Sequence, residues 1–579
     1  MGKPGPILRE IFKVGERPFS VFLFQHQLAW CPQKKGGEDM SEWINVKLKD
    51  ILSAEIVHKM GPLKGESNCC FPYSPTKKGI SYPFQVLQIA YAQMTNKDSE
   101  KWTDVRLELK HNDFTILTKW AQTIQYFLAE FDRPKNLLFF VNPFGGRGNA
   151  VSIFNSLMQP ILQLCQVKST VIQTKRQNHV SDVLRAMSDD ELMSYDAVVA
   201  VGGDGTICEV VNGLLTRRLN NLTDSDFTPA PIPVAVISAG STNAVAYTLH
   251  GTDDPRTAII HIVLGSPVPL DVASVHNDSG LLRFIVGQMS YGYLADLMLR
   301  SENLRWMGPQ RYKYAGFREF LNHSTYEGSI DIRPASEECR KIPSQCSGDK
   351  GCEDCISLDS MSSTSQQWKR IEGNFVGVSA ANISLRNPMT PLGIAPFAHF
   401  ADGCMELILI RKTSRLGHLR YLHRTTGDSR RTFALPFVER YRVREFVFTP
   451  MQCNTKHLQQ HITLDDVPPR QPASCKCDFG QEKTHSFWNC DGELLFQPSV
   501  RVCAHSNLIQ VLSRNHKDRE RTRSPSSGDG NDYSQCATVS SSLSFTQSPS
   551  AATDEEIDAS VIMLQDDESN NTSLNDVRF

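Results

Sequence analysis

Short apolar stretches alternate with charged turns over the first 130 residues of the chain. β-branched and aromatic residues dominate runs such as 19–30 and 82–94, which is typical of strands. The last run differs, because Ile116, Trp120, Ile124 and Leu128 recur every four residues and so predict a helix with one buried face. We therefore expect a small β domain over residues 1–130 that a C-terminal helix closes.

After residue 134 the pattern becomes strand, glycine-containing loop and helix, repeated. The four apolar strands expected in this part of the chain are 136–141, 169–174, 197–201 and 232–237. Repeated units of this kind form a parallel sheet covered by helices. Ligands of such sheets bind beyond the carboxyl ends of the strands. The sequence therefore predicts an α/β lobe over 134–265, with its loops gathered at one site.

The chain from 266 to 512 is mainly strand-like, which predicts a β-sandwich-like second lobe. Two polar, cysteine-containing insertions interrupt it near 335–368 and 452–486. Residues 513–579 are rich in serine and then acidic, and this composition predicts disorder. The predicted fold class is α/β, with a small N-terminal β-barrel followed by the α/β lobe and the β-rich lobe.

Composition narrows the function classes. A net charge of −2 over 579 residues gives no global electrostatic reason to expect a nucleic acid partner. The N-terminus lacks the apolar segment of a signal peptide, and no run is long enough to span a bilayer. We expect an intracellular, soluble protein, in which the 16 cysteines are free thiols or metal ligands rather than disulfides.

The stretch "AVVAVGGDGTICEVVNGLL", residues 197–215, contains the strongest chemical signal. Its apolar positions follow helical spacing and predict a helix that begins at or just after Thr206. Thr206 and Glu209 fit a capping box, in which the two side chains satisfy backbone N–H groups at the helix start. That interpretation explains these two residues without any ligand.

The glycines of this stretch need another explanation. One tight turn needs one glycine, whereas Gly202, Gly203 and Gly205 together indicate that a ligand approaches the backbone. A helix N-terminus favours phosphate. Asp204 would repel phosphate, unless it accepts a proton from an attacking hydroxyl or acts through Mg²⁺; an ordinary turn aspartate is the alternative. The loops 142–146 and 239–243 offer two further backbone cradles at equivalent places.

In this order the loops resemble the diacylglycerol kinase catalytic fold, which sphingosine, ceramide and bacterial lipid kinases share. The resemblance covers roughly 134–510 and rests on "VNPFGGRGNA", "VGGDGTICEVVNGLL", "AGSTNAVAY", "YGYLADLMLRSENLRWMGPQRYKYAG", "ADGCMELILIRK" and "WNCDGELL". The stretches "SENLRWMG" and "WNCDGE" are similar to ceramide kinases in particular. The N-terminal helix with Trp120 resembles the C-terminal helix of a pleckstrin homology domain, which supports the same subfamily.

The resemblance implies an ATP-dependent kinase that phosphorylates the primary hydroxyl of ceramide with Mg²⁺. Asp204 would be the catalytic base, and Gly202, Gly203, Asp204, Gly205 and Asp296 would contact the lipid. The residues implied around ATP are Asn142, Pro143, Phe144, Gly145, Gly146, Thr174, Lys175, Arg176, Gln177, Asn178, Glu209, Gly240, Ser241, Thr242, Arg305, Arg311, Asp491, Gly492 and Glu493.

One departure within the family bears on the substrate. Where sphingosine kinases have "ADVDLESE", this chain has "ADLMLRSE", with Met298 at the second acidic position. A desolvated ammonium without a carboxylate partner costs about 3–5 kcal/mol. The substitution therefore favours a neutral lipid such as ceramide over sphingosine. Diacylglycerol is neutral as well, so that substrate stays open. A non-catalytic lipid-binding adaptor is the rival of another class, although the intact loops favour an enzyme.

The cysteine cluster in the first polar insertion is a weaker signal. Cys346, Cys352 and Cys355 follow Cys339, and only the last pair has the spacing typical of Zn²⁺ ligands. A structural Zn²⁺ site and free thiols are both open interpretations.

Two segments point to partners and to location. The basic, leucine-containing segment 411–431 predicts a helix; the family resemblance implies calmodulin binding there, and a solvated helix is the alternative. The pleckstrin-like domain implies anionic lipids, with Lys64, Lys77 and Lys78 in its loops. We expect a cytoplasmic protein, peripheral on the Golgi or the plasma membrane.

Overall fold

The computed structural model describes residues 5–34, 37–38, 40–62, 81–96, 100–219, 227–308, 310–335, 368–451 and 485–514. The cysteines predicted as Zn²⁺ ligands (Cys346, Cys352 and Cys355) and the three lysines proposed for lipid binding lie outside these residues, as does the predicted acidic tail.

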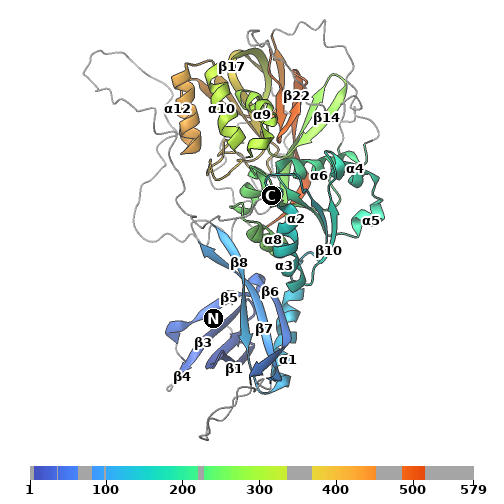
Figure 1. The fold of residues 1–579 in the computed structure, drawn as a ribbon, viewed down its shortest axis with the longest axis vertical. Helices are drawn as coiled ribbons and strands as arrows, with labels where there is room; N and C mark the ends of the chain where they lie inside the picture. Colours follow the sequence, from blue (N-terminus) through green and yellow to red (C-terminus); the bar gives the residue numbers. More distant parts are fainter. Residues whose placement is uncertain are drawn as a thin grey trace, which may run out of the picture. The chain divides into compact units, whose positions relative to one another are not determined.

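The N-terminal part contains two antiparallel sheets and one long helix (Figure 1). The first sheet holds β1 (Leu8–Val14), β2 (Arg17–Leu23), β3 (Gln27–Lys34), β4 (Gly37–Glu38) and β5 (Ile44–Lys47); the second holds β6 (Ile51–Pro62), β7 (Ser81–Asn96) and β8 (Lys101–Leu109). Helix α1 (Phe114–Ala129) starts at an Asp113 cap and buries Leu117, Trp120, Ala121 and Ile124. The predicted helix is confirmed, and a closed pleckstrin-like barrel stays a prediction.

The four predicted strands of the α/β lobe are present and parallel. They are β9 (Asn136–Val141), β10 (Lys168–Gln173), β11 (Ala197–Gly202) and β12 (Val234–Ser238), in the order β10-β9-β11-β12. Both β11 and β12 are buried at every position. Continuous apolar runs of this kind belong to sheets that are covered on both faces.

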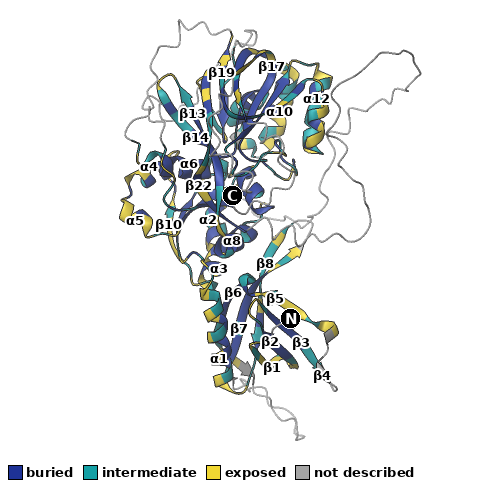
Figure 2. Ribbon diagram, turned by 180° about the vertical axis from the view of Figure 1, so that it is seen from behind, coloured by how far each residue is buried: buried dark blue, intermediate teal, exposed yellow. Residues whose placement is uncertain are grey.

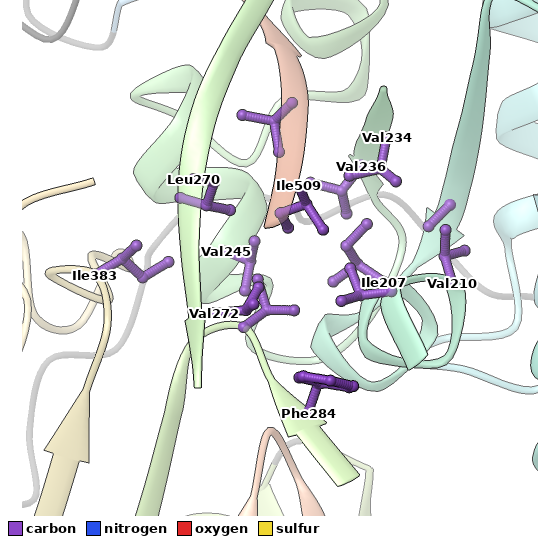
Figure 3. Close-up of a cluster of buried hydrophobic side chains, with 14 of the residues drawn as sticks. Ile207, Val210, Val234, Val236, Val245, Leu270, Val272, Phe284, Ile383 and Ile509 are labelled. Carbon is purple, nitrogen blue, oxygen red and sulfur yellow. The ribbon is translucent and has the colours of Figure 1, made fainter. Parts of the chain in front are cut away.

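Helices cover both faces of this sheet. The elements are α2 (Ala150–Ile153), the π-helical turn η3 (Phe154–Met158), α3 (Gln159–Leu164), α4 (His179–Ala186), α5 (Asp189–Met193), α6 (Asp204–Thr216), α7 (Ala244–His250) and α8 (Pro255–Leu264). One apolar cluster packs α4, α6 and α7 against the sheet, and a second packs α3 and α8. Figure 3 shows part of the first cluster, in which Ile207 and Val210 lie with Val234 and Val236.

The second lobe is β-rich, as predicted, and antiparallel. Its strands are β13 (Ser266–Asn277), β14 (Gly280–Ile285), β15 (Gln288–Gly292), β16 (Tyr326–Pro334), β17 (Lys369–Ala381), β18 (Met405–Arg411), β19 (Val438–Pro450), β20 (Trp488–Cys490), β21 (Glu493–Leu495) and β22 (Val500–Ser513). The sheet continues across the predicted boundary at 265, because β22 pairs with β12 through Val511 and Val234. The two lobes therefore share one 14-stranded sheet.

Helices of the second lobe follow β15 and β18. They are α9 (Tyr293–Glu302), the short turn η4 (Arg305–Met307), α10 (Gln310–Asn322), α12 (Arg415–Thr426) and η6 (Ser429–Ala434). The Ser414 hydroxyl caps α12 by accepting from the Gly417 N–H, so a helix forms within the basic segment 411–431 as expected. Within the described part of the chain, every helix is too short or too polar to cross a bilayer.

Candidate active site

A cavity of about 790 Å³ lies where the loops after the parallel strands meet α9 and α10. Its lining includes the following predicted residues: Asn142, Phe144, Gly145, Gly146, Thr174, Lys175, Arg176, Gln177, Gly203, Asp204, Gly205, Glu209, Gly240, Ser241, Thr242, Arg311, Asp491, Gly492 and Glu493. Pro143, Asn178, Gly202 and Asp296 do not line it. The side chain of Arg305 is outside the described part of the structure.

The glycines of the three loops mainly allow the loops to touch one another. A Cβ on Gly240 would lie 2.4 Å from the Cα of Gly203, and one on Gly146 would lie 2.7 Å from the Ala239 carbonyl oxygen. A Cβ on Gly202 would collide with the Thr206 side chain at 2.3 Å. Gly205 differs, since its nearest neighbours are 3.9 Å away. Close approach of a ligand, the reason inferred from the sequence, therefore applies best to Gly205.

Asp204 opens helix α6 and faces the cavity. Its Oδ1 accepts from the Val245 N–H at 2.8 Å and its Oδ2 from the Ala244 N–H at 3.1 Å, both at the start of α7. Burial raises the pKa of Asp204 to about 6, and the nearby Asp491 adds to the rise while the two N–H groups oppose it. A carboxylate with a pKa near neutrality is suited to accept a proton.

The predicted capping box is wrong. Helix α6 begins two residues earlier than expected, at Asp204, so Thr206 and Glu209 lie inside it. The Glu209 carboxylate instead accepts from the backbone N–H groups of Asn178 at 3.0 Å and Val180 at 3.2 Å, at the start of α4. Glu209 thus orders the loop after β10, and burial raises its pKa.

The Asp-Gly pair of "WNCDGELL" forms a two-residue hairpin turn between β20 and β21. Asp491 and Gly492 have φ of +49° and +90°, as a type I′ turn requires. The Asp491 carboxylate is almost fully buried and accepts from three successive backbone N–H groups: Val286 at 2.6 Å, Gly287 at 2.9 Å and Gln288 at 2.9 Å. Asp491 therefore fixes the start of β15, a role that the sequence analysis did not foresee.

Glu493 follows this turn, and it lines the cavity with its carboxylate held in an ion pair. Its Oε2 accepts from Arg283 Nη1 at 2.8 Å, and Arg283 Nη2 lies 3.3 Å from the Cys208 thiol of α6. The ion pair ties the β20–β21 hairpin to β14 and α6. Glu493 contacts the cavity from this fixed position.

The opposite wall of the cavity comes from α9 and α10. Leu294, Leu297 and Met298 give it an apolar surface. Glu302 also lines the cavity, and its Oε1 lies 3.4 Å from Arg311 Nη1. The guanidinium of Arg311 stacks on the Tyr312 ring at 4.7 Å, which holds the charge at the cavity edge.

Asp296 has a structural position instead of the predicted lipid contact. Its Oδ2 accepts from Tyr326 Oη at 2.5 Å and its Oδ1 from Ser486 Oγ at 2.8 Å. Both bonds point into the β-rich lobe, because Asp296 occupies the buried side of α9. Met298, two residues later, reaches the cavity instead.

Sequence reasoning missed part of the lining. The missed residues are Val180, Thr206, Ala244, Val245, Gln288, Leu294, Leu297, Glu302, Gly308, Tyr312, Leu385 and Asn489. Helical spacing offers a signal for Leu294, Leu297 and Met298, which share one face at intervals of three and four. Gln288, Leu385 and Asn489 carry no such signal, because distant strands bring them to the cavity.

The sequence analysis also predicted that the kinase uses Mg²⁺, so the site should offer carboxylate ligands for it. Among the residues that the structure describes, no group of three or more histidine, cysteine, aspartate or glutamate side chains could hold a metal ion. Mg²⁺ in phosphotransferases needs only one or two carboxylates, with substrate phosphates completing the shell. The half-buried Asp204, which faces the cavity, fits that requirement.

The cavity and its glycine loops belong to an ATP-dependent lipid kinase, as comparisons with known proteins show. Residues 136–275 match the family "Diacylglycerol kinase catalytic domain", and residues 288–527 match "Ceramide kinase C-terminal domain". The chain is 32% identical to ceramide kinase of Homo sapiens over 531 residues, which covers 86% of this chain and 94% of that one. The chain belongs to the ceramide kinase family.

A second relative is similar in sequence, and a solved structure is only distantly similar. Ceramide kinase of Mus musculus is 34% identical over 446 residues, covering 72% of this chain and 81% of that protein. A solved structure described as a diacylglycerol kinase from Bacillus anthracis aligns with a TM-score of 0.44 and 14% identity, over 67% of this chain and 97% of that one. Family membership implies ATP as phosphate donor and a divalent metal ion.

Proposed function

We propose that this enzyme transfers the γ-phosphate of ATP to the primary hydroxyl of ceramide, giving ceramide 1-phosphate. The observation that carries the proposal is the two-sided cavity. Glycine loops and the Asp204 carboxylate form one side, and the apolar residues Leu294, Leu297 and Met298 of α9 form the other. A polar phosphate donor and a lipid alcohol can thus meet at Asp204. The relatives named as ceramide kinases support the choice of lipid.

Asp204 is the general base in this mechanism. Its carboxylate accepts the proton of the lipid hydroxyl as the oxygen attacks the γ-phosphorus and the bond to the β-phosphate breaks. The N–H groups of Ala244 and Val245 hold the carboxylate in place. The backbone of the loops at Gly205 and Gly240 and the guanidinium of Arg311 stabilise the phosphates. Mg²⁺, when bound with ATP, neutralises phosphate charge.

A neutral substrate fits the charges on the α9 wall. Position 298 supplies no carboxylate, and Glu302, which does face the cavity, is engaged by Arg311. An ammonium would have to compete with that guanidinium or stay unpaired, and an unpaired desolvated charge is costly. The amide of ceramide carries no such charge.

The remaining expectations concern location and partners. We propose that the enzyme is cytoplasmic and peripheral on the Golgi or the plasma membrane, and that its N-terminal domain binds anionic lipids. Calmodulin binding at 411–431 is a further proposal, which follows from the family resemblance. A structural Zn²⁺ at the cysteine cluster is another, which follows from the spacing of Cys352 and Cys355.

Phosphate transfer from labelled ATP to ceramide, sphingosine and diacylglycerol tests the function directly. We expect ceramide to be the preferred acceptor and Met298→Asp to shift the preference toward sphingosine. Met298→Leu, which keeps the apolar surface, is the matched control. Preference for diacylglycerol or sphingosine by the wild-type enzyme would reject ceramide as the substrate. Absence of transfer to every lipid would favour the adaptor instead.

A further inference from the structure

The outer face of α10 carries large apolar side chains that nothing in the described structure covers. Tyr314, Phe317 and Leu321 are 45%, 60% and 49% exposed, and they recur at intervals of three and four on one face of the helix. The buried residues Ala315, Gly316 and Glu319 occupy the opposite face. Single exposed apolar residues are common, whereas a contiguous set marks an interaction surface.

Helix α12 extends this face. It begins where α10 ends, because Arg415 Nη2 donates to the Leu321 carbonyl oxygen at 3.1 Å, and the rings of His418 and Phe320 are 5.8 Å apart. The two helices lie side by side in both views (Figures 1 and 2). Leu416, on the first turn of α12, is 59% exposed. We call Tyr314, Phe317, Leu321 and Leu416 the α10–α12 surface.

The charges around this surface are basic. Arg415 and Arg420 on α12 and Lys313 on α10 are exposed. In these two helices, which the structure describes throughout, Glu319 is the one carboxylate, and it is buried in an ion pair with Arg300. Aromatic and aliphatic side chains ringed by arginine and lysine are typical of segments that lie in a membrane interface and bind anionic headgroups.

The α10–α12 surface is also connected to the active site. The N-terminal turn of α10 contributes Arg311 and Tyr312 to the cavity, and α9, which packs on α10, contributes its apolar wall. A bilayer on the outer face of α10 would therefore place a membrane lipid one helix away from Asp204. The substrate's hydroxyl has to reach the cavity from a membrane, so this proximity is useful to a lipid kinase.

We propose that the α10–α12 surface is a membrane-docking surface of the catalytic region that inserts Tyr314, Phe317, Leu321 and Leu416 into an anionic bilayer. The proposal rests on the lipid kinase assignment and not on ceramide being the lipid. It adds a second contact to any lipid binding by the N-terminal domain, and it orients the cavity toward the bilayer.

Co-sedimentation of the full chain with vesicles of phosphatidylcholine and phosphatidylserine, free of substrate lipid, tests the proposal. The double variant Phe317→Ser with Leu321→Ser should lose at least about tenfold in vesicle binding. Met193→Ser is the matched control, because Met193 is similarly exposed, at 57%, on α5. Its vesicle binding should match that of the wild type. Unchanged binding by the double variant would overturn the proposal.

A second variant and a second readout separate docking from folding and from catalysis. Arg415→Glu with Arg420→Glu should weaken binding about tenfold when phosphatidylserine is present and leave binding to pure phosphatidylcholine unchanged. Both variants should keep wild-type turnover of whichever short-chain lipid alcohol the enzyme phosphorylates in solution. Equal loss of soluble turnover and vesicle binding would assign these residues to the fold and reject the proposal. Loss of calmodulin binding with intact vesicle binding would assign the surface to a protein partner.

Discussion

Two Asp-Gly pairs line the cavity, and their carboxylates differ in hydrogen bonding and exposure. Asp204-Gly205 opens helix α6, whereas Asp491-Gly492 turns the hairpin between β20 and β21. Both carboxylates accept backbone N–H groups from distant segments. Asp204 takes one on each oxygen and stays half-buried at the cavity, while Asp491 takes three and is 5% exposed.

The contrast separates chemistry from architecture. Each carboxylate oxygen has two acceptor positions, so the Asp204 carboxylate keeps capacity for a substrate proton, whereas that of Asp491 is largely engaged by the start of β15. The same dipeptide thus presents an available carboxylate at one place, where we propose the base, and a structural anchor at the other. Substitutions at Asp204 should therefore lower activity, and substitutions at Asp491 should lower stability.

Asp204→Asn should have the largest effect. The amide cannot accept the hydroxyl proton, so kcat should fall about 10²–10⁴-fold. One of the two backbone N–H groups loses its acceptor, so the free energy of unfolding should fall by about 1 kcal/mol, less than at Asp491 because the Asp204 site is half-buried. Steady-state kinetics and calorimetry on the same preparation measure both quantities. Near-normal turnover would show that another group is the base.

Asp491→Asn should show the opposite balance. Its amide nitrogen would face a backbone N–H in a buried site, and a buried group left without a partner costs about 1–3 kcal/mol. We expect the free energy of unfolding to fall by about 2–4 kcal/mol, because the Val286 N–H loses its acceptor and the new amide NH2 group has none of its own. Denaturant unfolding measures the loss. A variant that is as stable as the wild type but inactive would show that Asp491 takes part in the reaction.

The pH profile should follow Asp204. Because burial raises the pKa of Asp204 to about 6, the free enzyme holds the base protonated below that pH and ionised above it. The value of kcat/KM should therefore fall about tenfold for each pH unit below the pKa and level off above it. Stability should also depend on this ionisation. The same raised pKa means that the folded state binds the proton more tightly than the unfolded state. Ionisation of Asp204 thus lowers stability as pH rises from about 4 to about 6. A kcat/KM that does not fall below about pH 6 would contradict Asp204 as the general base.

The two glycines should give the smallest effects. Gly492 has φ of +90°, so Gly492→Ala should lower the free energy of unfolding by about 1–2 kcal/mol. Gly205 lies in the first turn of α6 with nothing nearer than 3.9 Å, so Gly205→Ala should change stability by less than about 1 kcal/mol. Its methyl group faces the cavity and should raise the KM for ATP. If the two variants lose the same free energy of unfolding, Gly205 is also needed for the packing of the loop.

Local signals in the sequence were sufficient for much of the fold. Four apolar runs separated by loops and helical patterns predicted the strands β9 to β12 and their parallel pairing. The strands β9, β11 and β12 are buried as expected, whereas β10, at the edge of the sheet, is largely exposed. The same signals misplaced the start of α6. A T-x-x-E spacing looks like a capping box wherever it occurs, and only the position of α4 shows that Glu209 caps a different helix.

The candidate site was predictable where backbone loops form it. Loops that follow parallel strands gather at one edge by topology, so 142–146, 202–205 and 240–242 could be grouped in advance. Asp296 could not be placed, because Asp296 and Met298, two positions apart, lie on opposite sides of α9. Its partners Tyr326 and Ser486 are also 30 and 190 residues along the chain.

By itself, the sequence determined most of the strand and helix pattern of the α/β lobe, the glycine-containing loop around Asp204 and the apolar residue at 298, since each depends on neighbours in the chain. Only the tertiary structure decided which carboxylate is anchored and which is available. It brought the 286–288 backbone to Asp491 and the start of α7 to Asp204. Hydrogen bonds between segments about 40 to 200 residues apart leave no periodic trace in a sequence, yet they fix the positions of both carboxylates.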